Sequence, residues 1–166
     1  MKHLFCNICS TYSRITSMLN RLQPLSLLLL RLWVALAFWR AGMVKLADPM
    51  GTAYLFNYEY HVPLLSPDLA ASVGTYVELI APWLLGLGLF GRISALFLFV
   101  YNIVAVISYP DLWPNGLWAG FIGAAFIDHK AWGLMLLAIV LFGPGKLSID
   151  AAIAKWLLPR FSSRDH

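Results

Sequence analysis

The sequence predicts an all-α integral membrane protein, a bundle of four transmembrane helices with both termini in the cytoplasm. Only 12% of its 166 residues are charged and 60% are hydrophobic, whereas a soluble domain is about half apolar and about a quarter charged. The apolar residues form runs long enough to cross a hydrocarbon core of about 30 Å. The basic residues gather on one side of these runs. Membrane topology therefore explains the net charge of +4, and no nucleic-acid partner is predicted.

The N-terminal region, residues 1–23, is polar and basic and is predicted to be a cytoplasmic extension. It carries Cys6 and Cys9, which are too few for a disulfide framework. A closed zinc site needs four ligands, and His3 would be only the third. A redox or metal role of the two cysteines is the alternative to a plain extension. A signal peptide is not expected, because the apolar run continues too far and lacks a small-residue cleavage site.

Three spans are predicted in the first part of a membrane domain at residues 24–146. The first is expected at 24–46, about 20 residues. The loop 47–67 is rich in aromatic residues, which is typical of an interfacial segment. The second span is expected at about 68–90, and after a short turn the third is expected at about 92–109.

A fourth span is predicted from about residue 125 to the Gly-Pro-Gly at 143–145. The apolar run before it, 116–127, has only about 12 residues, which suits a re-entrant or interfacial segment better than a full crossing. Residues 147–166 are predicted to form a cytoplasmic amphipathic tail that Ser148 caps.

The basic residues predict the orientation of the spans. The side of the N-terminus carries Lys2, Arg14, Arg21, Arg92, Lys146, Lys155, Arg160 and Arg164. The opposite side carries Lys45 and Lys130 beside the acids Asp48, Glu59, Asp68, Asp111 and Asp128. The positive-inside rule therefore places both termini in the cytoplasm.

Several polar side chains fall within the expected spans, where an ionisable group costs at least a few kcal/mol unless it is paired or hydrated. Arg31 lies toward the cytoplasmic side, about 10 Å deep, and Asn102 lies near the middle of the third span. The outer half of the bundle holds the remaining five: Arg40, Lys45, Glu78, Asp128 and His129. Because these charges have both signs, we expect them to pair in a cavity open to the outer face.

Helical periodicity separates the cations of the first span. At about 100° per residue, Arg31, Gly42 and Lys45 share one face, and Arg40 points away from it. We expect Arg31 and Lys45 to point inward, because Gly42 allows a neighbouring helix to approach closely. Arg40 would lie at a helix flank or extend to the outer headgroups. Small residues share the face of Glu78 on the second span, which favours an inward Glu78.

The sequence leaves the roles of these groups open. Glu78 is either half of a structural ion pair with Lys45 or Arg31, or a ligand- or proton-handling group. His129 is either an interfacial histidine or a proton relay or metal ligand. Asn102 is expected to bond a neighbouring helix rather than a ligand. A haem with two histidine ligands is not expected, because only His129 lies at membrane depth, and flavin, iron–sulfur and nucleotide motifs are absent.

Three motifs carry a resemblance to a known family. They are an early arginine in a first span that ends in GMVKL (42–46), a glutamate in a second span followed by GLGLFGR (86–92), and the C-terminal DHKAWGLMLLAIVLFGPGKLSID (128–150). Together, over roughly residues 25–155, they resemble the DoxX family of small bacterial inner-membrane proteins. The resemblance implies a multi-pass four-helix protein related to the small subunit of thiosulfate:quinone oxidoreductase and to membrane parts of thiol-stress complexes.

The resemblance also implies roles for single residues. Polar positions of the family are matched by Arg31, Lys45 and Glu78, and a pattern found in part of the family is matched by Asp128 and His129. Asn102 stands where many relatives place another polar residue, often histidine. Catalytic roles are expected for Glu78, Lys45 and His129. Ligand binding is expected for Arg31, Arg40, Asn102 and Asp128, and no metal site is predicted. Cys6 and Cys9 lie outside the family core.

Two functions follow as expectations. The first is a redox subunit that links a thiol or sulfur donor to the quinone pool, with quinone as the cofactor, protons supplied by the outer polar groups, and a redox or peptide-maturation protein as partner. The second is a non-enzymatic scaffold, or an accessory that handles a metal or small solute, in which Glu59 and His61 would complete a site. A third, simpler expectation is that the polar groups only fix helix register. Whether the chain is an enzyme or a homo-oligomer is left open.

Overall fold

The structure is a computed structural model that describes the backbone of residues 2–161 and the side chains of residues 10–157. Within this part the chain is all-α, as predicted, with no strand. Its elements, in chain order, are α1 (Lys2–Ala47), α2 (Pro49–Tyr58), α3 (Pro67–Leu87), α4 (Gly91–Ser108), the 3₁₀ helix η1 (Pro110–Leu112), α5 (Leu117–Ile122), α6 (Ile127–Phe142) and α7 (Ile149–Phe161).

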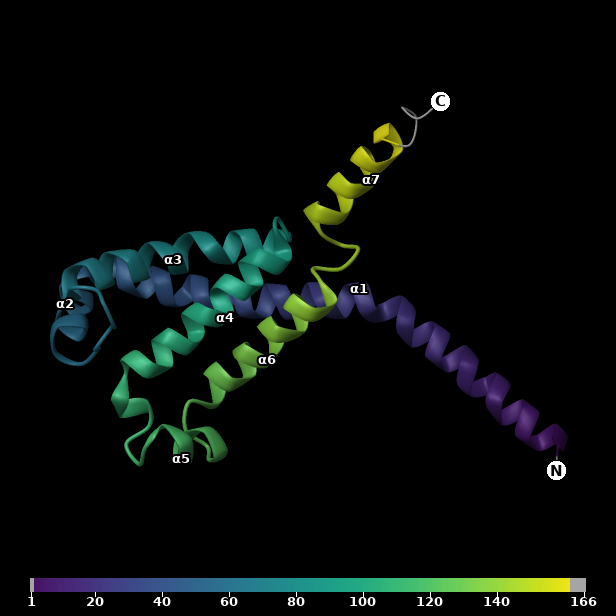
Figure 1. The fold of residues 1–166 in the computed structure, drawn as a ribbon, viewed down its shortest axis with the longest axis horizontal. Coiled ribbons are helices and arrows are strands. Elements are labelled where there is room, and N and C mark those ends of the chain that lie inside the picture. Colours follow the sequence, from purple (N-terminus) through teal and green to yellow (C-terminus); the bar gives the residue numbers. More distant parts are fainter. Residues whose placement is uncertain (1, 162–166) are drawn as a thin grey trace.

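Four of the helices form the body of the molecule. α1 packs against α3 and α6, and α4 packs against the same two helices. Successive members of this set run in opposite directions, so both chain ends leave from one end of the bundle (Figure 1). The core between them is apolar, with Val34, Leu85, Leu98, Leu136 and Ile139 fully buried. We call the end from which the termini leave the inner end, and the end that carries α2 and α5 the outer end.

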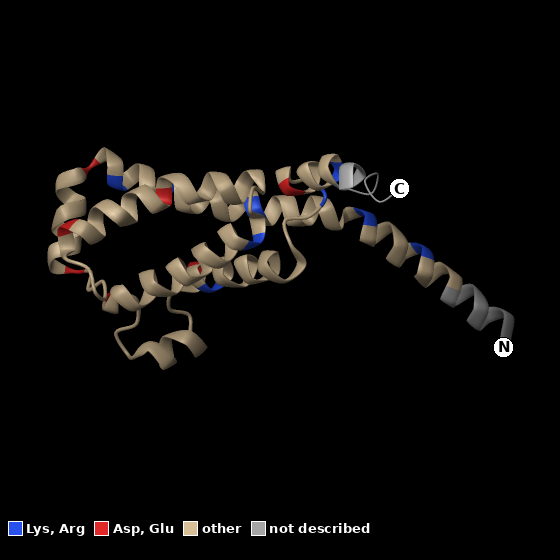
Figure 2. Ribbon diagram, turned by 45° about the horizontal axis from the view of Figure 1, so that its top comes forward, with Lys and Arg blue, Asp and Glu red and all other residues tan. Residues whose placement is uncertain are grey.

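The charges differ between these two ends. Figure 2 shows most acidic residues gathered toward the outer end and most basic residues toward the inner end and the N-terminal half of α1. This distribution is the one from which the positive-inside rule predicts an inner end in the cytoplasm.

Among the described residues, three helices are long and apolar enough to cross a membrane. They are the segment Ser10–Ala47 of α1, α3 and α4. α6 has 16 residues, or about 24 Å of helix, which is shorter than the typical span of about 20 residues. A fourth complete crossing, and with it the N-in/C-in topology, stays a prediction.

The first helix differs from the one expected at 24–46. α1 is continuous from Lys2 to Ala47 and contains Pro24 in its interior. Figure 1 shows α1 changing direction about midway, which is where Pro24 falls in the sequence. An internal proline removes one helical hydrogen bond and kinks the helix without ending it when both flanks remain helical.

The segments around the outer end are short helices. α2 lies within the loop expected at 47–67, and the Asp48 carboxylate caps it by accepting a hydrogen bond from the Gly51 amide at 2.8 Å. α5 occupies six residues of the run 116–127. Lys130 secures its end by donating to the Gly123 carbonyl at 2.5 Å. At the other end of the chain, Ser148 caps α7 as expected, accepting from the Ala151 amide at 3.2 Å.

Candidate functional site

An ion pair between α1 and α3 forms the centre of the site. Lys45 Nζ lies 2.5 Å from Glu78 Oε2, and the two side chains are only 18% and 8% exposed. The pair depends on Gly42, because a Cβ atom there would stand 2.9 Å from the Glu78 carbonyl carbon and 3.0 Å from its Cβ. The predictions that Lys45 and Glu78 point inward are therefore confirmed, and Gly42 allows α3 to approach α1 closely, as expected.

Tyr101 on α4 completes the contacts of the buried carboxylate. Its hydroxyl donates a hydrogen bond to Glu78 Oε1 at 2.9 Å. Each carboxylate oxygen of Glu78 thus has a donor, one cationic and one neutral. Sequence reasoning missed Tyr101. The available signal was a tyrosine in the middle of an apolar span, where its hydroxyl needs a partner.

A second polar contact joins α4 to α6. The amide nitrogen of Asn102 donates to the His129 backbone carbonyl at 2.9 Å, and Asn102 Oδ1 lies 2.9 Å from His129 Nδ1. A carbonyl only accepts, so the amide nitrogen must face it and Oδ1 must accept from Nδ1–H. In neutral His129 the proton is therefore on Nδ1, and Nε2 is an acceptor. The interhelical hydrogen bond expected of Asn102 is confirmed.

Aromatic rings connect the two polar contacts. The Phe38 ring centroid lies 6.1 Å from that of Tyr101 and 5.6 Å from that of Trp132. The Trp132 ring in turn lies 4.9 Å from the His129 ring. The Glu78 and His129 sites are thus neighbours on either side of one aromatic wall.

Three of the five groups expected to pair in the outer half do not join the ion pair. His129 bonds Asn102 instead, and the other two lie apart. Arg40 and Asp128 are exposed, and neither forms an ion pair with another residue of the described chain. Helix geometry explains why Arg40 and Asp128 point away from the sites of Lys45 and His129. Arg40 precedes Lys45 by five residues, about 140° around α1, and Asp128 precedes His129 by one, about 100° around α6.

Arg31 belongs to the inner end and not to the Glu78 site. Its side chain is fully buried, and it donates to the carbonyls of Gly86 at 3.2 Å and Leu147 at 2.5 Å. The pairing of Arg31 with Glu78, one of the alternatives considered, is therefore wrong. Arg31 instead joins the end of α3 to the segment between α6 and α7.

Two further contacts at the inner end link segments far apart in the sequence. The Asp150 carboxylate accepts hydrogen bonds from the Phe90 and Gly91 amides at 2.8 and 2.7 Å, which caps the start of α4. Arg92 donates to the carbonyls of Val140 and Leu141 at 2.6 and 2.9 Å, near the end of α6. The motifs at 86–92 and 128–150 therefore contact each other.

α2 covers the outer side of the ion pair. Thr52 is buried and its hydroxyl donates to the Lys45 carbonyl at 3.1 Å. Phe56 packs with Ala70 and Ala71 of α3. Next to it Tyr60 is half-buried, and burial raises the pKa of its phenol above the ordinary value, so Tyr60 is neutral at physiological pH.

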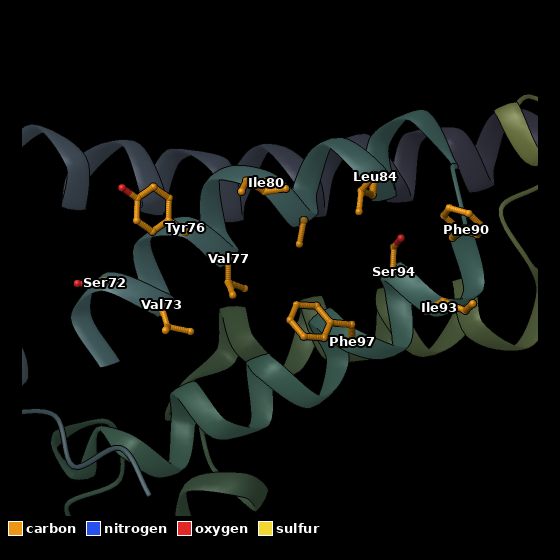
Figure 3. A pocket seen from close by; sticks show the side chains of 11 residues that line it. Ser72, Val73, Tyr76, Val77, Ile80, Leu84, Phe90, Ile93, Ser94 and Phe97 are labelled. Atoms are coloured by element: carbon orange, nitrogen blue, oxygen red, sulfur yellow. The ribbon is translucent and has the colours of Figure 1, made fainter. Parts of the chain in front are cut away.

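An apolar groove opens between α3 and α4 on the surface of the bundle (Figure 3). It has a volume of about 560 Å³, and its walls include Val73, Tyr76 and Val77 of α3 and Ile93 and Phe97 of α4. Tyr101 follows Phe97 by one helical turn on the same side of α4. The groove thus runs along the two helices that hold Glu78 and Tyr101.

A metal centre has no support in the described chain. Among residues with described side chains, no group of three or more His, Cys, Asp and Glu residues could hold a metal ion. His61, considered as a ligand, contacts the Glu59 carbonyl through Nδ1 at 3.2 Å. The side chains of Cys6 and Cys9 lie outside the described residues, so their role stays a prediction.

Comparison with protein families gives one match. The DoxX family model matches residues 26–110, just over half of the 166 residues. The matched range includes Arg31, Lys45, Glu78 and the motif at 86–92, whereas the motif at 128–150 lies beyond it. Comparisons with curated proteins and with solved structures found no match. On this match, the chain belongs to the DoxX family.

Proposed function

We propose that this DoxX protein is a redox subunit of the bacterial inner membrane that links a thiol or sulfur donor to the quinone pool. Oxidation of two thiols to a disulfide releases two electrons and two protons, and a quinone takes up the same number to become a quinol. Quinone is the substrate that the membrane provides. The chain's own polar residues would deliver the protons.

The observation that carries this proposal is the double contact of Glu78. A carboxylate buried among membrane helices is costly unless it is paired, and such groups are by default candidates for function. Lys45 supplies the pairing at 2.5 Å, and Tyr101 adds a donor at 2.9 Å. Lys45, Glu78 and Tyr101 together can hold a proton in more than one place without exposing a bare charge to lipid.

The groove between α3 and α4 supports a quinone as the ligand. Its lining is almost wholly apolar, and it faces the side from which a lipid-soluble molecule would arrive. A quinone ring also needs hydrogen-bond donors, and Tyr101 lies one turn beyond the groove residue Phe97. On this proposal the groove residues bind and orient the apolar part, and Tyr101 positions the ring.

The position of the site predicts the side of the electron donor. The ion pair lies toward the outer end, whereas Cys6 and Cys9 lie in the N-terminal half of α1, beyond the inner end. Electrons would therefore come from a partner protein or small thiol on the outer face, and the two cysteines would take no part.

The test measures quinone bound to protein purified in mild detergent. Quinone is extracted and quantified by chromatography from wild type, Glu78→Gln and Asp128→Asn. Asp128→Asn is the matched control, because it also removes an acid near the outer end but one that is exposed. We expect near-stoichiometric quinone in wild type and the control, and a loss of at least about tenfold in Glu78→Gln, as for removal of a charge-assisted contact.

Two outcomes would contradict the proposal. Quinone retained in Glu78→Gln would separate quinone binding from the polar site. No quinone in any of the three proteins would favour the alternative, a non-enzymatic scaffold or solute-handling accessory in which the Lys45–Glu78 pair only fixes helix packing.

A further inference from the structure

The N-terminal half of α1 extends beyond the bundle. Arg31 contacts the Gly86 carbonyl near the inner end of α3, and the α6–α7 segment approaches α1 at Leu27. Residues before Leu27 therefore lie past the inner ends of α3, α4 and α6, and Figure 1 shows this segment leading away from these three helices. Residues 2–26 make about 37 Å of helix at 1.5 Å per residue.

Four of the exposed large apolar side chains of this segment are separated alternately by three and four residues, and Met18 and Leu25 lie beside them. The four are Tyr12, Ile15, Leu19 and Leu22, each more than half exposed. In the sequence the same spacing reaches back to Ile8 and Phe5. This alternation is the heptad pattern that places a narrow apolar seam along one side of a helix, as in a coiled coil. We call Tyr12, Ile15, Leu19 and Leu22 the α1 seam.

The charges of the segment lie away from the α1 seam. Between residues 10 and 26 the only charged residues are Arg14 and Arg21, seven positions apart. At about 100° per residue both project about 130° from the centre of the seam. The positions that flank the seam carry uncharged residues: Thr11, Thr16, Met18 and Gln23. Two identical seams can therefore meet without bringing like charges together.

We propose that the α1 seam docks against the α1 seam of a second copy of this chain, forming a parallel two-stranded coiled coil at the inner end. Both copies have the same orientation in the membrane, so their extensions leave it side by side and point the same way. A single helix of this length is only marginally stable in water. Pairing removes the exposed apolar side chains from water and stabilises both helices.

The seam continues onto the membrane-embedded part of α1, which supports a second copy as the partner. The next positions of the heptad are Ser26, Leu29, Trp33 and Leu36, and all are exposed. The contact between two copies can therefore run from the extension onto the lipid-facing side of the bundle. The proposal does not depend on the quinone function.

A bilayer surface is the other environment that could cover apolar side chains. A helix lying on a membrane has a broad apolar face with cations at the headgroup level on its flanks. Here the repeating apolar positions form a narrow seam, and Arg14 and Arg21 project about 130° from its centre rather than at its edges. The segment also leads away from the inner end rather than across it (Figure 1). These features favour a second copy.

The test is disulfide cross-linking of the full chain in membrane vesicles. Cys6 and Cys9 are replaced by serine, and a single cysteine is introduced at the seam (Leu19→Cys) or on the opposite face (Ser17→Cys). Both positions are exposed, so each cysteine is equally free to react and neither substitution disturbs packing. After mild oxidation, covalent dimer is measured on a non-reducing gel at two ratios of lipid to protein.

We expect about tenfold more dimer from Leu19→Cys than from Ser17→Cys, because only the seam brings equivalent Cβ atoms within disulfide distance. The Leu19→Cys yield should not fall when the protein is diluted with lipid. Equal yields that fall on dilution would mean random collision and would overturn the proposal. A Leu19→Cys protein that stays monomeric would also overturn the proposal. Labelling of that cysteine with a water-soluble maleimide then shows where the helix lies. Labelling only after detergent is added would indicate a helix on the membrane surface.

Discussion

Both ends of the bundle bury a cation, but they satisfy it in different ways. At the outer end Lys45 meets the carboxylate of Glu78. At the inner end Arg31 meets backbone carbonyls of Gly86 and Leu147. A carboxylate can take up a proton and change partner, whereas a carbonyl held in the backbone only accepts hydrogen bonds. Buried charge therefore ties helices together at both ends, but only the outer pair includes a group that can take up a proton.

The largest effect on stability is expected from Arg31→Met. The substitution removes the hydrogen bonds of a fully buried guanidinium to the carbonyls of Gly86 and Leu147, and a hydrogen bond to a charged group is worth about 1.5–3 kcal/mol. The apparent unfolding temperature in detergent, followed by circular dichroism, should fall sharply. Arg40→Met is the control, because Arg40 is exposed. Equal losses in the two variants would show that the backbone contacts of Arg31 are not what matters.

The second-largest effect on stability is expected at the outer end, from substitutions in the Lys45–Glu78 ion pair. Lys45→Met alone leaves Glu78 without its cation and should cost on the order of 3 kcal/mol. The double variant Lys45→Met/Glu78→Met removes both charges and should regain most of that stability. The unfolding free energies of wild type, the two single variants and the double variant form a double-mutant cycle, which gives the coupling energy between the Lys45 and Glu78 side chains.

The same cycle distinguishes the two interpretations of the ion pair. If the pair serves quinone chemistry, the double variant is stable but retains no quinone. A double variant that is stable and also retains quinone would reduce the pair to a packing device, the simplest of the expectations from the sequence.

Sequence reasoning succeeded where the signal was local. The inward face of α1 follows from the spacing of Arg31, Gly42 and Lys45, because a helix repeats every few residues whatever surrounds it. The membrane character of the chain follows equally from composition, and three apolar helices support it. The same periodicity placed Arg40 away from the core, and the structure confirms that Arg40 is exposed.

The missed features depend on contacts between distant segments. Nothing near Asp150 in the sequence indicates that it caps a helix that begins 59 positions earlier, at Gly91. Tyr101 gains its partner only because α3 places Glu78 beside its hydroxyl. The sequence predicts that a span starts at Pro24, but the helix continues through it, because one lost hydrogen bond does not outweigh helical flanks on both sides.

A smaller effect is expected from Asp150→Ala at the inner end. It removes the acceptor for the Phe90 and Gly91 amides, and loss of a helix cap costs about 1 kcal/mol. The α6–α7 segment would also lose a tie to the bundle, so limited proteolysis near residues 143–150 should become faster. Asp111→Ala, an exposed acid at the outer end, should leave the cleavage rate unchanged. Unaltered proteolysis in Asp150→Ala would mean that the remaining contacts hold the segment, among them Arg31 with the Leu147 carbonyl and the Asp150 amide with the Gly88 carbonyl.

The smallest effect on stability, and the most informative one, is expected from Tyr101→Phe. The ring stays in place against Phe38, and only the hydrogen bond to Glu78 is lost, which costs about 1 kcal/mol. If Tyr101 also positions a quinone ring, bound quinone should fall much more than stability does. Tyr76→Phe provides the control, because Tyr76 lines the groove without contacting Glu78. Equal quinone in Tyr101→Phe and Tyr76→Phe would confine Tyr101 to orienting Glu78. A selective loss in Tyr101→Phe would make this hydroxyl the point at which the groove and the ion pair act together.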